Sequence, residues 1–141
     1  MGVTAAVELV DQEQRDAVLE MVSEVIRLHL WPLGPGGPDG LGWPLGRAID
    51  DRLIETAIAR VPGVRSVAPV RLFTRAARGR NWVAVIEDST GRGRINLQPW
   101  QLPELAMLSV GVGSTASATL PPGGRGLDGD GVAIPVVPEM C

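Results

Sequence analysis

Several residue types are missing or scarce in this chain of 141 residues, and each absence excludes a kind of chemistry. All 13 basic side chains are arginine, which excludes a lysine nucleophile and the lysine of a phosphate-binding loop. The single cysteine, Cys141, cannot form an internal disulfide. No apolar run approaches membrane-spanning length, and no signal-peptide pattern is present. We therefore expect a protein of a reducing compartment with no membrane anchor.

Net charge and aromatic residues are also low. The formal charge of −3 argues against bulk electrostatic capture of nucleic acid, and aromatic residues make up only 4% of the chain. Glycine and proline are abundant, at 18 and 12 residues, which indicates long loops or extended segments. The length suits a single domain with a core of ordinary size.

Two amphipathic helices are predicted in the first half of the chain. Asp11 can cap a helix over 12–30, in which apolar residues recur on one face and charged residues on the other. A second helix is predicted to begin at the Asp50-Asp51 pair and to end at Pro62-Gly63. Adjacent carboxylates at this position are better explained by a helix start than by acid–base catalysis.

The remaining regular segments have the composition of strands. Pro69 places a bulge or a free edge inside one of them. The turn cluster 88–91, with Gly91 supplying a positive φ, predicts a hairpin between 82–87 and 94–97. The predicted strands are residues 3–10, 64–73, 82–87, 94–97 and 105–112.

The order β-α-α-β-β-β-β predicts an α+β fold, with both helices on one face of a mainly antiparallel sheet. Residues 1–112 form this domain, and 113–141 are expected to be a Gly/Pro-rich tail that is disordered or extended. Within the tail, the apolar and proline-interrupted segment 132–138 would suit an extended arm lying on another surface, or simple disorder.

The stretch from Trp31 to Asp50 contains the run GPGGPDGLG between two WPLG tetrads. Phosphate-binding loops follow a strand and use glycine amides, whereas this run follows a helix and its prolines remove two amide donors. The tryptophans argue against a flexible linker. We expect a stiff corner in which prolines fix φ, glycines allow tight reversal and each tryptophan pins one end to a helix. Arg47 is expected to bond loop carbonyls or Asp39.

No set of residues has the pattern of a catalytic or metal site. His29 is the single histidine, and near a helix C-terminus it is expected to stabilise the helix dipole. No Cys/His cluster accompanies it to complete a metal site. We therefore expect neither an enzyme nor a cofactor.

Arginines gather around the predicted hairpin, with Trp82 nearby. Arginine beside an aromatic ring can bind single-stranded nucleic acid. A solvated hairpin tip or a salt-bridged protein interface is the stronger reading, because the net charge is negative and aromatics are few. The arginines are Arg71, Arg75, Arg78, Arg80, Arg92 and Arg94.

The corner and the following turn resemble a known family. In the C-terminal module of baseplate J-like proteins, a helix ends in a segment of the form hPLtGGpDG-GWpfGR, a second helix follows, and a vpGV turn leads into strands. These are wedge proteins of phage tails and phage-tail-like contractile injection systems. The resemblance covers about residues 1–112, although Leu45 replaces the usual aromatic and family members carry a long region ahead of the module. The motif residues are Trp31, Pro32, Leu33, Gly37, Asp39, Gly40, Gly42, Trp43, Pro44, Gly46, Arg47, Pro62 and Gly63.

The resemblance implies a structural role in the bacterial cytoplasm, within an assembled phage-tail-like particle. Wedge proteins associate with copies of themselves and with a second wedge protein around the spike hub, and link it to the tube and sheath. The candidate interface from the residues themselves is Arg75, Arg78, Arg80, Trp82, Arg92 and Arg94. The alternative function is a small nucleic-acid-binding module that uses the arginine-rich hairpin.

Overall fold

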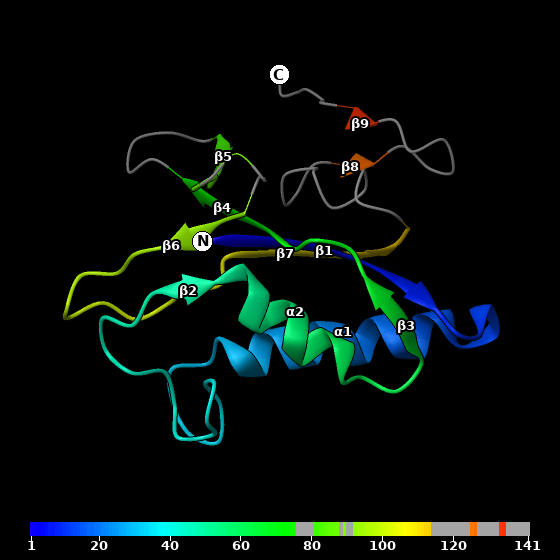
Figure 1. Ribbon diagram of the computed structural model, residues 1–141, viewed down its shortest axis with the longest axis horizontal. Helices are drawn as coiled ribbons and strands as arrows, with labels where there is room; N and C mark the ends of the chain where they lie inside the picture. The colour runs from blue at the N-terminus through cyan, green and yellow to red at the C-terminus, as the bar shows by residue number, and fades with distance from the viewer. Residues whose placement is uncertain (76–80, 88, 90–91, 114–124, 127–132, 135–141) are drawn as a thin grey trace.

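The computed structural model describes residues 1–75, 81–87, 89, 92–113, 125–126 and 133–134. Helices α1 (Arg15–His29) and α2 (Asp51–Ala59) lie together on one side of a sheet (Figure 1). This arrangement confirms the predicted α+β fold. No helix in the described part of the chain is both long enough and apolar enough to cross a bilayer.

Both helices begin where the sequence predicts. Asp11 accepts a hydrogen bond from the amide of Glu13 and caps the short 3-10 helix η1 (Gln12–Gln14), which leads directly into α1. Asp50 accepts from the amide of Arg52 and caps α2. Each cap satisfies an amide that has no partner within its own helix.

Strand β1 (Gly2–Leu9) is the centre of the sheet. Along one side it pairs in parallel with β7 (Met107–Val112). Along the other it pairs antiparallel with β3 (Val64–Val67) and then β4 (Arg71–Arg75). Strand β5 (Trp82–Ala84) extends the sheet beyond β4. The sheet is therefore antiparallel except at the β1–β7 pair.

The predicted irregularity at Pro69 is confirmed by the register. Val7 lies opposite Val67 and Thr4 opposite Arg71, so four steps on one strand match three on the other. This extra residue is a β-bulge between β3 and β4. Here the amide of Val70 donates to Glu55 of α2 at 2.8 Å, so the bulge links the sheet to the helix layer.

The predicted hairpin between 82–87 and 94–97 closes at its turn, where the amide of Glu87 donates to the carbonyl of Arg92 at 2.7 Å, but its two arms pair with other strands. Strand β5 pairs with β4, whereas β6 (Arg94–Ile95) pairs with β2 (Ile49–Asp50) ahead of α2. The cause is a contact distant in sequence: Gly93 donates its amide to the Asp51 carboxylate at 2.8 Å and accepts from the Asp51 amide at 3.3 Å. Gly91, expected to supply the turn's positive φ, lies outside the described residues.

The core lies between the helices and β1. Alternate residues of β1 face the helices, and valine and isoleucine side chains of α1 and α2 pack against them. Each such side chain, when fully buried, contributes about 1.5–3 kcal/mol relative to an exposed one. The fully or almost fully buried members include Val3, Val7, Val18, Val22, Ile26, Ile54, Ile58 and Leu72.

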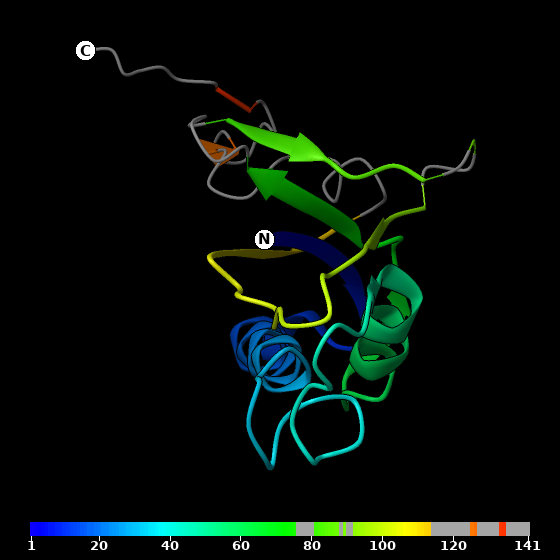
Figure 2. The same ribbon diagram turned by 90° about the vertical axis from the view of Figure 1, so that its left-hand side faces the viewer.

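Of the predicted tail, the structure describes residue 113 and two short strands. Strands β8 (Arg125–Gly126) and β9 (Ala133–Ile134) pair antiparallel and lie on the side of the sheet away from the helices (Figure 2). The rest of 113–141, including most of the apolar segment 132–138, lies outside the described residues.

Candidate functional site

The segment 31–47, called the corner below, projects from the helix layer between α1 and β2 (Figure 2). Its backbone bonds to itself and to the end of α1. Gly37 donates to the carbonyl of Leu28 at 2.9 Å, and Gly42 to that of Gly36 at 2.7 Å. Trp43 donates its amide to the carbonyl of Pro32 at 3.2 Å. The corner is therefore a folded element and not a linker.

Gly42 is required by the path of the chain. Its φ is +87°, and a Cβ at this position would lie 2.5 Å from the carbonyl oxygen of Pro32. A side chain would thus meet backbone in a conformation that L-residues disfavour. The glycines of the motif let the two arms of the corner approach closely.

Trp43 fixes the corner to the helix layer. Its side chain is only 4% exposed, and its indole N–H donates to the carbonyl of Arg47 at 3.0 Å. The ring meets the last residue of α1, His29, edge to face, with centroids 5.7 Å apart. The predicted pinning role is thus confirmed for Trp43. Trp31, by contrast, is 53% exposed, so its ring is not buried as that of Trp43 is.

His29 sits in a partly buried setting that disfavours its charged form. Burial lowers the pKa of the imidazole, and the nearby positive charge of Arg47 lowers it further. Its Nε2 atom is buried without a hydrogen-bond partner in the described structure. A neutral ring packed on Trp43 fits this environment better than the expected cation at the helix terminus.

Arg47 bonds as expected, but weakly. Its Nη1 atom lies 3.6 Å from Oδ2 of Asp39, which makes an ion pair and not a hydrogen bond. Both side chains are well exposed, so the pair contributes little to stability. Beside it, Gly46 donates to the carbonyl of Gln101 at 3.0 Å and so joins the corner to the segment before β7.

Large apolar side chains on and beside the corner face solvent. Leu41, between two glycines, is 88% exposed, and Trp100, next to the Gln101 contact, is 72% exposed. Trp31, Leu33, Leu41 and Leu45 belong to the corner itself, and the others lie at the end of α1 and in the segment before β7. We call this set the apolar surface: Leu28, Trp31, Leu33, Leu41, Leu45, Trp100 and Leu102.

The second half of the motif has a structural place. Pro62 and Gly63 follow α2, and Gly63 has a φ of +93°. Its carbonyl accepts from the amide of Val10 at 2.9 Å, and a Cβ would lie 2.7 Å from the Val18 side chain. The turn thus packs against α1 and directs the chain into β3.

Arg92 is partly buried and is held between two carboxylates. Its guanidinium donates two hydrogen bonds to Glu55, at 2.8 and 2.9 Å, and its Nε atom lies 3.5 Å from Asp51. Burial raises the pKa of Asp51, while the Gly93 amide and Arg92 act to lower it. This network ties α2 to the segment before β6, so we assign Arg92 to internal structure.

The other arginines of the candidate interface are dispersed. Arg75 of β4 lies over the ring of Trp82 on β5, 5.4 Å from its centroid, which is a cation–π contact. Arg94 is exposed on β6, in the separate two-stranded sheet. Arg78 and Arg80 lie outside the described residues. The described arginines therefore do not form one continuous basic surface.

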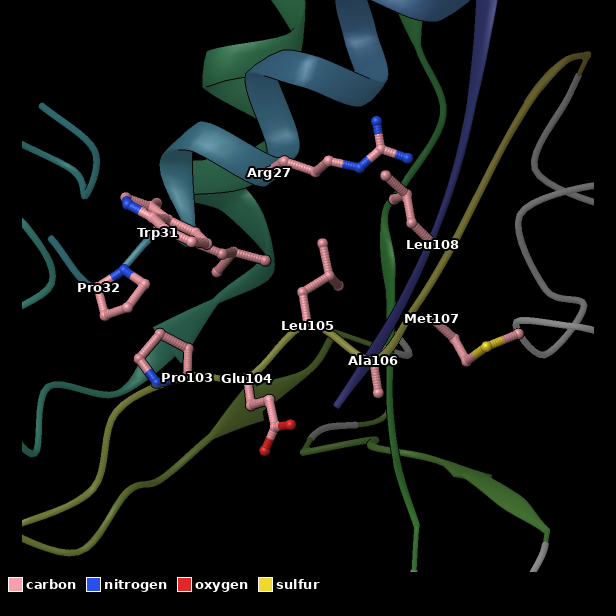
Figure 3. A pocket seen from close by; sticks show the side chains of 10 residues that line it. Arg27, Trp31, Pro32, Pro103, Glu104, Leu105, Ala106, Met107 and Leu108 are labelled. Atoms are coloured by element: carbon pink, nitrogen blue, oxygen red, sulfur yellow. The ribbon is translucent and has the colours of Figure 1, made fainter.

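A hollow of about 360 Å³ lies beside the apolar surface. Side chains from the end of α1 and from the segment leading into β7 surround it (Figure 3). Arg27 and Glu104 supply charge at its wall, and Trp31 and Leu105 supply apolar surface. Among the described residues, no group of three or more His, Cys, Asp or Glu side chains could hold a metal ion.

Sequence reasoning missed the Glu55–Arg92 bridge and the outward leucines. The bridge has no local signal, because its partners are 37 residues apart. The outward leucines did have a local signal. Leu41 and Leu45 lie among glycines and prolines, where no helical or strand periodicity places them in a core.

Comparison with known proteins finds no significant match: no protein-family model, no curated protein and no solved structure. Any statement of function therefore depends on the chemistry of these surfaces and on the motif.

Proposed function

We propose that the chain is a structural assembly subunit: a baseplate wedge component, or part of one, in a phage-tail-like contractile particle. The observation that carries this proposal is the apolar surface, displayed on a corner that its own hydrogen bonds hold rigid. A rigid apolar surface suits a lasting contact between subunits, because little conformational freedom is lost on binding.

The same residues that build the corner carry the resemblance to baseplate J-like proteins. Trp43, Gly42 and Gly37 hold the corner in shape, and the leucines of the same segment face solvent, where a partner could bind them. A binding role for the segment would explain why its apolar residues remain outside the core. The proposed partners are other copies of the chain and a second wedge protein, with the spike hub, tube and sheath as further neighbours.

The proposal is tested by incorporation into particles. Phage-tail-like particles are sedimented from cells that express the chain, and the particle fraction is probed for it. The double variant Leu41→Ser, Leu45→Ser should reduce incorporation at least about tenfold, since truncating interface anchors commonly costs about 1 kcal/mol or more each. Both positions are exposed, so folding should be unaffected.

Val10→Ser is the matched control. Val10 is 60% exposed but lies between β1 and η1, away from the corner, so this variant should be incorporated normally. Absence of the wild-type chain from the particle fraction would contradict the proposed function. If the wild type, the double variant and Val10→Ser were incorporated equally, the apolar surface would not be the surface through which the chain assembles.

A further inference from the structure

Strand β7 forms one edge of the main sheet. In the described part of the chain, β1 is its sole strand partner, and the pairing runs without interruption from Gly2–Met107 to Val7–Val112. An edge strand presents backbone N–H and C=O groups that can pair with another strand.

Within the described residues, β7 itself has none of three features by which proteins usually prevent such pairing: a charge, a proline or a bulge. The sequence of β7 is MLSVGV, with no charged residue and no proline. Its continuous register also excludes a bulge. In the described structure, six consecutive uncharged residues on a sheet edge suit the addition of a strand from another chain.

We propose that β7 pairs antiparallel with β7 of a second copy of this chain, around a twofold axis. An uncharged strand can face its own copy without bringing like charges together. The two sheets would then join into one continuous sheet, with the helices of both copies on the same side.

The alternation of side chains restricts the register. Leu108, Val110 and Val112 face the helix layer, so each must lie opposite a residue that faces the same way. The numbers of any two paired residues therefore add up to an even number. At the centre of such a register, one residue must lie opposite the same residue of the second copy. Near the middle of the strand, this residue is either Ser109 or Val110.

The space around Gly111 selects Ser109. In this register Met107 lies opposite Gly111 of the second copy, and Leu108 lies opposite its Val110. A Cβ placed on Gly111 would have nothing within 4 Å, so there is room for the methionine. The register centred on Val110 would leave that space unfilled, because it sets Gly111 against Ser109.

The hollow beside β7 fits the same register. Ala106 lines it and lies opposite Val112 of the second copy, which carries an apolar side chain toward the helix side. Trp31 and Leu105 provide apolar walls there (Figure 3). Val112 of the second copy would thus occupy the hollow that the first copy alone leaves open.

The β7–β7 contact would be the surface through which the chain binds its own copy, and in that respect the inference rests on the proposed function. Its test uses purified protein alone. A dimer that never enters particles would contradict the proposed function and leave the contact standing. A chain that enters particles but is monomeric when pure would contradict the β7 contact and leave the proposed function standing.

Disulfide trapping tests the register. Ser109→Cys in a Cys141→Ser background should form a covalent dimer on mild oxidation, because directly opposed strand residues are close enough to be bridged. Val10→Cys in the same background is the control, since Val10 is exposed and lies three residues beyond the last β1–β7 pair, well away from the axis at Ser109. Equal trapping at the two positions would overturn the register.

A charge swap tests the contact without relying on one variant's stability. Ser109→Arg should weaken the dimer at least about tenfold, as measured by analytical ultracentrifugation, because it opposes two like charges. Mixing it with Ser109→Glu should restore a dimer that contains one copy of each. A monomeric wild type, no rescue on mixing, or pairing of β7 only with a different protein would overturn the proposal.

Discussion

The indole of Trp43 stands edge-on to the imidazole of His29, with ring centroids 5.7 Å apart and ring planes at 76°. One ring belongs to the corner and the other to the last residue of α1. The indole N–H, bonded to the carbonyl of Arg47, keeps the ring in this orientation. The pair joins the surface proposed for assembly to the hydrophobic core.

Replacement of Trp43 should therefore destabilise the whole domain. Trp43→Ala is expected to lower the free energy of unfolding by about 3–5 kcal/mol, because it leaves a cavity in the core and removes the bond to Arg47. Trp31→Ala, whose ring is half exposed, should cost less than about 1 kcal/mol. Chemical denaturation of the two variants measures the difference. Equal losses would show that Trp43 does not anchor the corner.

Gly42 offers a test of the corner's backbone. Gly42→Ala should cost more than about 1 kcal/mol, since φ is +87° and the new methyl group would meet the carbonyl of Pro32. Gly34→Ala is the control, because its Cβ would find its nearest neighbour at an ordinary 3.5 Å. Thermal unfolding of both variants should show a clear loss of stability only at Gly42.

Features set by neighbouring residues could be predicted from the sequence. The caps at Asp11 and Asp50 and the bulge at Pro69 each follow from one residue type at one position. The partner of β6 could not be predicted, because it depends on Asp51 bonding to a residue 42 positions away. The sequence also could not predict that β7 runs parallel to β1, because an apolar strand pattern is the same in both directions.

The Arg92 network should contribute more to stability than any surface ion pair of the described structure. Arg92→Met is expected to cost about 2–3 kcal/mol, somewhat below the value for a fully buried pair because the guanidinium is partly exposed. The loss arises mainly from leaving the buried Asp51 carboxylate with less compensation. Arg27→Met breaks the exposed pair with Glu24 and should cost at most about 0.5 kcal/mol. Urea denaturation measures the loss of stability in each variant. Similar losses for Arg92→Met and Arg27→Met would mean that the Arg92 network contributes no more than an exposed ion pair.

Acid should weaken the fold through His29. Burial lowers the pKa of this imidazole below its ordinary value of 6.5 in the folded state, so the unfolded chain binds the proton first as the pH falls. The stability contribution of the neutral ring is therefore complete above pH 6.5 and is lost as the pH falls toward the folded-state pKa. Because the chain has one histidine, its NMR titration is unambiguous, and the midpoint should lie below 6.5. The control variant His29→Gln should lack this part of the pH dependence. A midpoint at or above the ordinary value would mean that the ring is solvated, and that its contact with Trp43 does not hold the corner against α1.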